Sequence, residues 1–593
     1  MKTILELITE EMKRGFTSAG YDEKFASCSL SNRPDLCEYQ CNGALSAAKE
    51  YHKNPMDIAN DVVNKISGSN VFSEVVVAKP GFINLKVQGA FLADFVDSMR
   101  KDKERMGYEK EPVKRTVFVD YGGPNVAKPL HVGHIRSAVI GESIKRILKF
   151  AGHTVYGDIH LGDWGTQLGQ IICELQDRKP NLPYFDDNFT GEYPKESPFT
   201  ISELEDIYPA GSKKSKESEE FHKRAMDATY KLQKGHRGYT AIFKHIIDVS
   251  VKDMSKIYDR LNVHFELWKG ESDADPYIPD MIKDMKNKGL AYESNGALVM
   301  DVDEPEDKVD MPPIMILKSD GAANYNTTDL ATLVWRMNEY HSDEVVYVVD
   351  KRQDLHFVQL FRCAKKAGIC APNVRLEFIG FGTMNGKDGK PFKTRTGGVM
   401  RLEDLLDEIN EKMYEKIRTN HDIPEDEAKD IAKKVCVAAL KYGDLSNQAS
   451  KDYIFDLDRF TSFEGNTGPY ILYTIVRIKS ILKKFEETKG ADFAELIKEP
   501  VGESDRFLML VLSRFSEIMK VAYEDMAPHK ICSFIYDVCD AFNHFYHSVK
   551  ILSEENESIR NHYISLLKVT ERVLLCSICL LYTSDAADER YTV

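Results

Sequence analysis

The sequence predicts an α/β domain built on a parallel sheet, with a small α+β domain before it and an all-α bundle after it. Three observations predict this order. The first hundred residues combine helical patterns with a strand pair, short β-rich runs alternate with helices from Thr116 onward, and nearly everything after Leu402 has helical period. A chain of 593 residues is long enough for several such domains.

The first domain is expected over residues 1–105. Apolar residues recur at helical spacing in Ile4–Phe16 and again in Ala44–Tyr51. Residues 74–87 are typical of two strands joined at Pro80-Gly81, a dipeptide that favours a type II turn. A charged stretch, residues 99–115, is then expected to form a linker.

The second domain is expected over residues 113–402, as a Rossmann-like parallel sheet with helices. A helix from about His134 to Phe150 follows the first strand, and Gly152 is its stop signal. A polar, helix-rich stretch at about residues 177–268 interrupts the sheet and is expected to be an insertion. The predicted strands are Thr116–Tyr121, Glu344–Val349 and Arg375–Met384.

The third domain, residues 403–593, is expected to be a helical bundle. Tyr470–Leu482 and Arg506–Met519 are examples of its helical pattern. The residues after Leu581 are polar and have no period, so no element is expected there.

Composition indicates a soluble, cytoplasmic protein. Eleven cysteines, an odd number spread from Cys28 to Cys579, argue against a secreted disulfide framework. No apolar run approaches the roughly 18 residues of a membrane span, and the N-terminus lacks a signal-peptide pattern. The net charge of −15 excludes a histone-like coat for nucleic acid, although it allows basic patches on one face.

The stretch PNVAKPLHVGHIRS, residues 124–137, carries the most informative chemistry. It lies between the first strand and the first helix of the α/β domain, where open sheets bind ligands. His131 and His134 fall on one side of a helical start, where two donors suit a phosphate that gains negative charge. Gly133 lets a flat base approach the backbone, and Lys128 adds a positive charge nearby.

Two alternatives compete with this phosphate-binding hypothesis. The histidine pair could be half of a metal site completed by His153, His160 and Asp163, although no CxxC or HExxH pattern closes such a site. An isolated pair could also be purely structural. The setting of strand, Gly-Gly-Pro-Asn, Lys, His-Val-Gly-His and helix favours phosphate binding.

The same stretch resembles the His-Ile-Gly-His signature of class I aminoacyl-tRNA synthetases, and its flanks resemble the arginyl branch of that class. The resemblance covers about residues 1–581 and implies a catalytic Rossmann-like domain, an N-terminal tRNA-binding domain and a helical anticodon-binding domain. Further segments that resemble this branch occur in the same order: GDWGTQLG (162–169), SDGAANYNTTDLAT (319–332), VVDKRQDLHF (348–357) and FEGNTGPYILYTIVR (463–477).

The resemblance also implies an arginine pocket. In similar enzymes a Tyr-x-x-x-Asp pair holds the guanidinium, which matches Tyr325 and Asp329 here, with Gln353 in the same pocket. A guanidinium is always charged and rewards a bidentate carboxylate. From the residues alone, however, Asp329 follows Thr327-Thr328 at a predicted helix start, where an aspartate is more often a helix cap.

Other matched positions concern the rest of the two small substrates. Asp120, Asn125 and His131 match positions that hold the α-amino and carboxylate groups of the amino acid. Gly122 and Gly123 depart from the family, which often has Ser there, so a hydroxyl contact must be lost or replaced by backbone N–H. The expected ATP-binding residues are Pro124, Asn125, Lys128, His131, Gly133 and His134.

The second class I signature, Lys-Met-Ser-Lys-Ser, is absent from the sequence. GKDGKPFKTRTGGVM, residues 386–400, takes its place after the last predicted strand. Lys393 and Arg395 on this Gly-rich loop suit a clamp on the triphosphate, although an ordinary basic hairpin turn is the alternative. With Lys128, His131 and His134 they form the predicted catalytic set, and Mg²⁺ is expected to bridge the phosphate oxygens.

Contacts with RNA are expected in the first and third domains. Tyr473, Arg477 and Lys484 fall on one face of the helix from Tyr470, and stacking rings with cations grip single-stranded loops. A polar outer face on a packed helix is the equally good alternative. The resemblance adds Phe82 and Asn84, in the strand pair of the first domain, as contacts to the tRNA elbow.

The resemblance implies an ATP-dependent ligase that activates L-arginine as an adenylate and transfers it to tRNA(Arg). A monomer is the default expectation for its oligomeric state. Another class I synthetase, such as a cysteinyl enzyme, is one alternative, but zinc ligands would be expected near its pocket and the sequence shows none. A non-catalytic tRNA-binding paralogue is the other. Such a paralogue should have lost its His-x-Gly-His or pocket residues, which are intact here apart from the two glycines.

Overall fold

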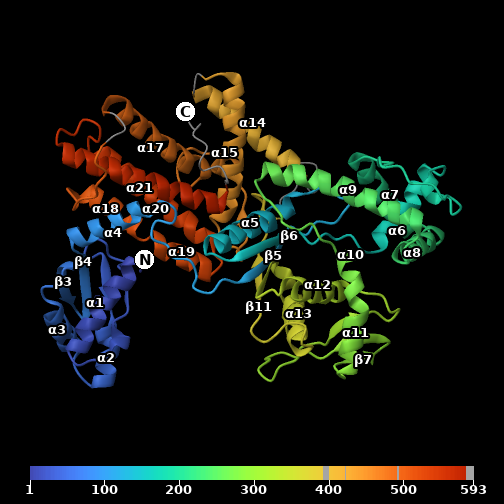
Figure 1. Ribbon diagram of the computed structural model, residues 1–593, viewed down its shortest axis with the longest axis horizontal. Coiled ribbons are helices and arrows are strands. Elements are labelled where there is room, and N and C mark those ends of the chain that lie inside the picture. The colour runs from blue at the N-terminus through green and yellow to red at the C-terminus, as the bar shows by residue number, and fades with distance from the viewer. Residues whose placement is uncertain (391–399, 421–422, 490–492, 583–593) are drawn as a thin grey trace. The chain divides into compact units, whose positions relative to one another are not determined.

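The computed structural model describes residues 1–390, 400–420, 423–489 and 493–582. They form two compact units (Figure 1). Unit 1 combines Met1–Lys110 with the chain from Phe463 onward, and unit 2 is Glu111–Ser462. Residues 403–462, which the sequence groups with the third domain, therefore belong to the same unit as the parallel sheet.

The first part of unit 1 is a four-stranded antiparallel sheet of order β1-β2-β4-β3, covered by helices. Helix α1 begins at a capping box in which Thr3 and Glu6 exchange hydrogen bonds. The predicted strand pair is confirmed, but the type II turn is wrong. The Lys79–Pro80 bond is cis and Gly81 N–H donates to Ala78 O, so the proline takes the third turn position. The elements are α1 (Ile4–Ser18), β1 (Cys28–Leu30), β2 (Tyr39–Cys41), α2 (Gly43–Tyr51), α3 (Pro55–Ile66), β3 (Phe72–Ala78), β4 (Phe82–Val87) and α4 (Gly89–Lys101).

The second part of unit 1 is the predicted helical bundle, drawn in orange to red in Figure 1. It packs against the first part through charged pairs as well as apolar contacts. Arg506 donates to Glu38 Oε1 (2.7 Å) and to Val87 O (2.6 Å), and Arg100 pairs with Glu495 (3.1 Å). The helices are α17 (Gly468–Lys489), α18 (Glu503–Ser513), α19 (Phe515–Glu524), α20 (Pro528–Ser548) and α21 (Glu557–Leu581).

Unit 2 is built on a parallel sheet of order β11-β10-β5-β6, which confirms the predicted α/β class. The chain leaves β5 toward β6 on one side and later enters β10 on the other. The strand order therefore reverses between β5 and β10, and the carboxyl ends of those two strands flank the crevice where such sheets bind ligands. The strands are β5 (Thr116–Tyr121), β6 (Thr154–Asp158), β10 (Glu344–Asp350) and β11 (Arg375–Phe381).

Helices cover this sheet and extend away from it. The predicted first helix is confirmed as α5 (Ile135–Phe150), preceded by a 3₁₀ turn at Val132–His134. Phe118, Leu333 and Val345 are fully buried members of the core that packs on one face of the sheet. The helices between the strands are α6 (Thr166–Arg178), α7 (Ile201–Glu217), α8 (Glu219–Gln233), α9 (Arg237–Arg260), α10 (Glu271–Ala274), α11 (Ile278–Asn287), α12 (Tyr325–Tyr340) and α13 (Asp354–Lys366).

The remaining elements of unit 2 surround the sheet. A small antiparallel sheet has the order β7-β8-β9, and β12 pairs with β13 in parallel. Along the described part of the chain, no helix combines the length and apolar character needed to cross a lipid bilayer. These elements are β7 (Ala291–Ser294), β8 (Ala297–Met300), β9 (Ile314–Leu317), β12 (Met384–Asn385), α14 (Leu402–Asn420), α15 (Glu425–Leu445), β13 (Tyr453–Ile454) and α16 (Leu457–Phe460).

Candidate active site

The histidine motif follows β5 at the point where the strand order reverses. The loop before it is fixed by a parallel bridge, in which Gly162 N–H donates to Pro124 O (3.0 Å) and Val126 N–H donates to Gly162 O (3.2 Å). A Cβ atom on Gly162 would lie 2.3 Å from Asn125 Oδ1, so only glycine leaves room for that amide. The GDWG segment thus shapes the loop that carries Asn125.

The rings of His131 and His134 are in contact, with centroids 3.9 Å apart and planes tilted by 36°. His131 Nδ1 accepts from Gly133 N–H (3.1 Å), and His134 Nδ1 accepts from His131 N–H (3.1 Å). Burial, together with His131 and Lys128, lowers the pKa of His134 to about 3, and burial also lowers the pKa of His131. Both rings are therefore neutral near pH 7. Because each Nδ1 accepts, each Nε2 carries the proton and is a hydrogen-bond donor.

Gly133 lies between the two histidines in the sequence and is exposed. A Cβ atom there would lie 2.8 Å from His131 Cε1 and would displace that ring. The glycine is therefore needed for the geometry of the histidine pair.

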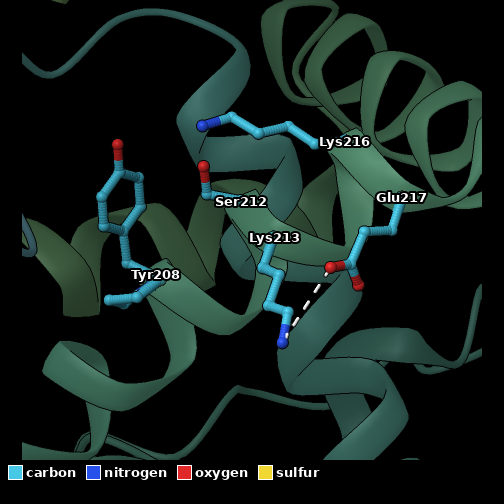
Figure 2. A pocket seen from close by; sticks show the side chains of 6 residues that line it. Tyr208, Ser212, Lys213, Lys216 and Glu217 are labelled. Atoms are coloured by element: carbon cyan, nitrogen blue, oxygen red, sulfur yellow. Dashed lines mark ion pairs between the residues drawn. The ribbon is translucent and has the colours of Figure 1, made fainter.

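Lys128 lies over the ring of Tyr208 in α7, with Nζ 4.8 Å from the ring centroid. The same tyrosine lines a hollow of about 390 Å³ on α7, shown in Figure 2. Lys213 and Lys216 line it too, and Lys213 pairs with Glu217 at 3.9 Å. Lys128 therefore contacts the same tyrosine that lines this hollow together with Lys213 and Lys216.

The sequence-based alternative for Asp329, a helix cap, is wrong. Helix α12 begins at Tyr325, and its cap is Asn324, whose side chain accepts from Thr327 N–H while Asn324 N–H donates to the Thr327 hydroxyl. Asp329 stands one turn further along, so its carboxylate is left for other partners. One of them is His356, whose Nε2 is 2.7 Å from Asp329 Oδ2.

The two residues of α12 that are predicted to bind the guanidinium lie together with His356 and His160. The sequence analysis connected neither histidine with these residues. The Tyr325 ring contacts the His356 ring at 5.0 Å between centroids, and His160 Nε2 is 3.6 Å from Asp329 Oδ1. His356 Nδ1 is 2.8 Å from Asn326 Oδ1, which anchors that ring from its other side. The available signal was spacing, because His356 lies three residues after Gln353 at the start of α13.

Asp120 has a partner that the sequence did not reveal. Arg336, fully buried on α12, donates to Asp120 Oδ2 (2.6 Å) and to Asp158 Oδ2 (2.9 Å). Burial raises the pKa of Asp120, although Arg336 and His160 pull it down. Burial opposes a charge on His160, but Asp120, Asp329 and Asp158 outweigh it and raise the pKa of His160. Asp120, Asp158, Arg336 and His160 thus form a buried network of charged groups that extends to Asp329.

Glu271, at the first position of α10, is a further acidic group that the sequence analysis missed. Burial raises its pKa to about 7, with Asp329 and Asp163 adding to the rise and His160 and the Trp164 N–H opposing it. A carboxyl that ionises near neutral pH and interacts electrostatically with Asp329 is a candidate partner for a cationic ligand. No sequence pattern marks it, because its neighbours come from distant segments.

The glycines that replace the family's serine have committed backbone groups. Gly122 N–H donates to Ser137 Oγ (2.8 Å), and Gly123 N–H donates to Ile159 O (2.9 Å). Ser137 Oγ in turn donates to Val348 O (2.7 Å), so it bridges β5 and β10 at the crevice. Neither N–H is free to replace a hydroxyl contact to a ligand.

The other predicted residues of unit 2 differ in accessibility. Gln353 is exposed in the turn after β10, and Tyr325 has 62% of its surface exposed. Asn125 is exposed and Pro124 is buried. Lys393 and Arg395 lie outside the described residues.

The alternative metal site does not come together. His153 precedes β6, and its Nδ1 accepts from Arg115 N–H at 3.2 Å. This places His153 at the amino ends of the strands, whereas the histidine motif lies at their carboxyl ends. Asp163 instead accepts from the N–H (2.9 Å) and hydroxyl (2.6 Å) of Ser272, which fixes the start of α10. Within the described ranges, no three His, Cys, Asp or Glu side chains are placed to hold one metal ion.

The predicted RNA-binding face on α17 is organised around Arg477. Its guanidinium lies 4.8 Å from the Tyr473 ring centroid and 5.3 Å from that of Tyr546 on α20, and it donates to Asn543 Oδ1 (2.9 Å). Tyr473 and Tyr546 are both partly exposed. Lys484 is exposed further along α17, and the sequence did not indicate Tyr546 or Asn543.

In the first domain, the two residues that are predicted to contact the tRNA elbow, Phe82 and Asn84, lie on β4. Asn84 Oδ1 accepts from Gln40 Nε2 of the neighbouring strand β2 at 2.8 Å, and Phe82 is half-buried at the start of the strand. The two residues alternate along the strand and therefore share one face of the sheet.

A parallel sheet whose order reverses beside a His-x-Gly-His loop defines the catalytic domain of a class I aminoacyl-tRNA synthetase. The family model described as tRNA synthetases class I (R), catalytic domain, matches residues 96–457. The models for the arginyl tRNA synthetase N terminal domain and the DALR anticodon binding domain match residues 2–87 and 471–581. The chain belongs to the arginyl-tRNA synthetase family.

Individual relatives agree with this assignment. An arginine–tRNA ligase of Agathobacter rectalis is 59% identical over 590 residues, covering 98% of this chain and 99% of the relative, and one of Alkaliphilus oremlandii is 51% identical over 581 residues, covering 98% and 99%. The crystal structure of the Plasmodium falciparum arginyl-tRNA synthetase matches with a TM-score of 0.77 at 26% identity over 98% of both chains. The Thermus thermophilus enzyme, at 20% identity and a TM-score of 0.74 over 97% of this chain and 98% of that one, has the same fold.

Proposed function

We propose that this chain is an arginine–tRNA ligase whose two reactions take place at the crevice between β5 and β10. The arginine carboxylate attacks the α-phosphate of ATP and pyrophosphate leaves. The terminal adenosine hydroxyl of tRNA(Arg) then attacks the adenylate carbonyl and releases AMP. The observation that carries the proposal is the paired geometry of His131 and His134 at the carboxyl end of β5.

In this proposal the histidines stabilise charge on the phosphates. Two Nε2–H donors, neutral near pH 7 and held by the backbone, can strengthen their hydrogen bonds as charge develops without first reorganising. Lys128 supplies a point charge beside them, and Lys393 and Arg395 are proposed to act on the leaving pyrophosphate. No side chain has to act as nucleophile, so positioning and electrostatics carry the rate.

Arginine is proposed to bind with its guanidinium toward Asp329 and Tyr325. Glu271 adds a second carboxyl near that end. Gln353 is proposed to lie in the same guanidinium pocket. Asp120, Asn125 and His131 are proposed to hold the α-amino and carboxylate groups. Asp120 contributes through its buried pair with Arg336, which limits it to at most one free oxygen for the substrate.

Mg²⁺ is part of the proposal as a companion of ATP. The groups around the histidine motif are nitrogen donors, whereas Mg²⁺ prefers oxygen ligands and is commonly held by substrate phosphates and water. We therefore assign no residue of this chain to the ion. We also propose that the enzyme acts as a monomer, which light scattering would test.

The decisive experiment is arginine-dependent exchange between ATP and pyrophosphate in the presence of tRNA(Arg). Exchange that requires arginine, together with arginyl-tRNA formation, supports the proposal. If exchange instead depends on another amino acid, the enzyme is a different class I synthetase. If no amino acid supports exchange, the chain is a tRNA-binding paralogue.

Glu271 gives the first specific prediction, the pH dependence of arginine binding. Below a pKa of about 7 this carboxyl is protonated and cannot pair with a cation, so protons compete with arginine. The KM for arginine is therefore expected to fall as pH rises from 6 to 8, by up to about tenfold per pH unit below the pKa. Exchange kinetics between pH 5.5 and 8.5 measure it.

Glu271→Gln is the matching variant. It should have a higher arginine KM at pH 8 and a profile that no longer changes near pH 7. If the variant keeps the wild-type profile, another group titrates and Glu271 does not contact arginine.

RNA binding on α17 gives the second prediction. Charge reversal at Arg477 and Lys484 should weaken tRNA binding and lower the slope of log K against log salt by roughly 1–2, because fewer counterions are displaced. ATP affinity should not change, because the histidine motif belongs to unit 2. The measurement is tRNA binding at several salt concentrations.

The control reverses the same number of charges elsewhere. Lys283 and Lys286 are exposed on α11, and their reversal should leave the salt slope at the wild-type value. Equal slopes in both double variants would show that the α17 face only solvates the helix and that RNA binds elsewhere.

A further inference from the structure

Arg136 lies two residues after His134, but it points into the protein and not toward the crevice. Only 2% of its surface is exposed. Its Nε donates to Asp444 Oδ1 (2.9 Å), and its Nη1 donates to Gly382 O (2.8 Å) and Lys451 O (2.9 Å). Its guanidinium also lies 5.0 Å from the Tyr453 ring centroid. One side chain of α5 thus contacts three separate segments of the chain.

The acceptors mark the place where the chain enters the second signature region. Gly382 follows β11 directly, and β12 then pairs with β13, so that Met384 is opposite Tyr453. The fit there is close, because a Cβ atom on Gly382 would lie 2.5 Å from Asp452 Oδ1. Arg136 therefore fixes the chain a few residues before Gly386, where that region begins.

The other end of the same region is also bound to the histidine motif. Val132 N–H donates to Met400 O (3.1 Å), and Leu402 N–H donates to Leu130 O (2.9 Å). His131 and Arg401 form an antiparallel bridge between these bonds. Both ends of the second signature region are thus bound to the first signature and its helix. Arg136 holds the end where the chain enters the region, and backbone hydrogen bonds hold the end where the chain leaves it.

We propose that Arg136 is a positioning residue for arginine activation, which sets the entry of the second signature region relative to His131 and His134. This inference rests on the proposed function. A guanidinium suits the task because its planar fork can hold a carboxylate and two carbonyl oxygens at fixed angles, whereas a lysine ammonium has no such plane. The chain at Gly382 then keeps one position relative to α5.

A purely structural ion pair would predict something different. Removing one partner of any buried pair destabilises a fold, but it need not change the kinetics of molecules that remain folded. Positioning predicts a selective loss, because the second signature region is proposed to act on the pyrophosphate end of ATP and not on arginine.

The test compares Arg136→Lys with Arg146→Lys. Arg146 is a matched control on the same helix, where it donates to Glu142 Oε1 (2.8 Å) and Asn262 O (2.7 Å), about 15 Å further along the axis at 1.5 Å per residue. Exchange kinetics are measured at 20 °C on protein shown to be folded by circular dichroism, with tRNA present and with ATP, pyrophosphate and arginine varied in turn.

For Arg136→Lys, kcat is expected to fall roughly tenfold or more and the KM for pyrophosphate to rise several-fold, while the KM for arginine stays within about twofold. Arg146→Lys should keep wild-type kinetics, even if its unfolding midpoint falls. Asp444→Asn keeps an oxygen acceptor for Arg136 and should show the same selective loss in milder form, which covers the case in which Arg136→Lys does not fold.

Wild-type kinetics in folded Arg136→Lys, or in Asp444→Asn where Arg136→Lys does not fold, would overturn the inference. The inference would also be overturned if Arg146→Lys lost as much kcat as Arg136→Lys. A rise in the KM for arginine as large as the rise in the KM for pyrophosphate would overturn it too. Failure of the proposed function is recognised separately, because the wild-type protein would then show no arginine-dependent exchange at all.

Discussion

Replacement of His134 by alanine is expected to slow arginine activation by about 10²–10³-fold, or about 3 kcal/mol in the barrier, with little change in the KM for arginine. The Nε2–H donor of His134 is fixed because its Nδ1 accepts from His131 N–H. A donor held in this way strengthens only when the phosphates gain charge, so its loss affects the transition state more than the bound substrate.

His134→Asn serves as the control for this prediction. Its side-chain oxygen can still accept from His131 N–H, but the variant lacks a donor at the Nε2 position. It should lose nearly as much activity as alanine while retaining the local fold. If His134→Asn has wild-type kcat in the exchange assay, His134 contributes only by accepting a hydrogen bond from His131 N–H, and its proposed role at the phosphates is wrong.

The pH profile gives an independent check on the same residue. Because the pKa of His134 is lowered to about 3, its ring stays neutral across the working range. The activity of the His134 variants, expressed as a fraction of wild-type activity at the same pH, should therefore be the same at pH 6 and at pH 8.5. A titration near pH 6.5 that disappears in His134→Asn would show that an imidazolium is the active form.

Local sequence patterns predicted those features whose cause is itself local. The alternation of short strands with helices reflects burial on both faces of a parallel sheet, and β5, β10 and α5 lie where that pattern places them. The histidine pair was predictable for the same reason, since its hydrogen bonds join residues at most three positions apart.

Features that depend on long-range packing could not be predicted. His160 lies 3.6 Å from Asp329, and Glu271 interacts electrostatically with Asp329. The two residues come from separate segments, and no periodicity links them. The cap of α12 was misplaced because Thr327-Thr328 has the composition of a helix start, whereas Asn324 has both the side chain and the extended backbone that capping needs. Arg336 was missed because a charged residue on a helix is normally expected at the surface.

Discrimination between amino acids should depend most strongly on Asp329. In the proposed arginine pocket, this carboxylate has His356 on one oxygen and His160 near the other. The nearby buried network already contains Asp120 and Asp158. A ligand that brings a planar cation can complete this arrangement. Lysine brings a compact ammonium that cannot fill a planar site, and citrulline keeps the shape but not the charge. Both should be rejected by roughly 10⁴-fold, because their binding leaves buried polar groups unpaired.

Asp329→Asn is therefore expected to lose most of its activity with arginine and to narrow the preference for arginine over citrulline. The amide oxygen can still accept a hydrogen bond from His356, so the pocket should remain folded while its charge is lost. The measurement is exchange with arginine, lysine and citrulline at saturating tRNA. Asp284→Asn makes the same chemical change on the surface of α11, beside Lys288, and should match the wild-type protein.

If Asp329→Asn instead keeps wild-type efficiency and preference, the guanidinium partner is elsewhere. Asp120 was the next candidate from the sequence, but its pair with buried Arg336 already uses its charge. Glu271 is the better alternative, because its proton is held only by burial and by neighbouring carboxylates and a cation would release it. In that case Glu271→Gln, and not Asp329→Asn, should abolish the preference for arginine over citrulline.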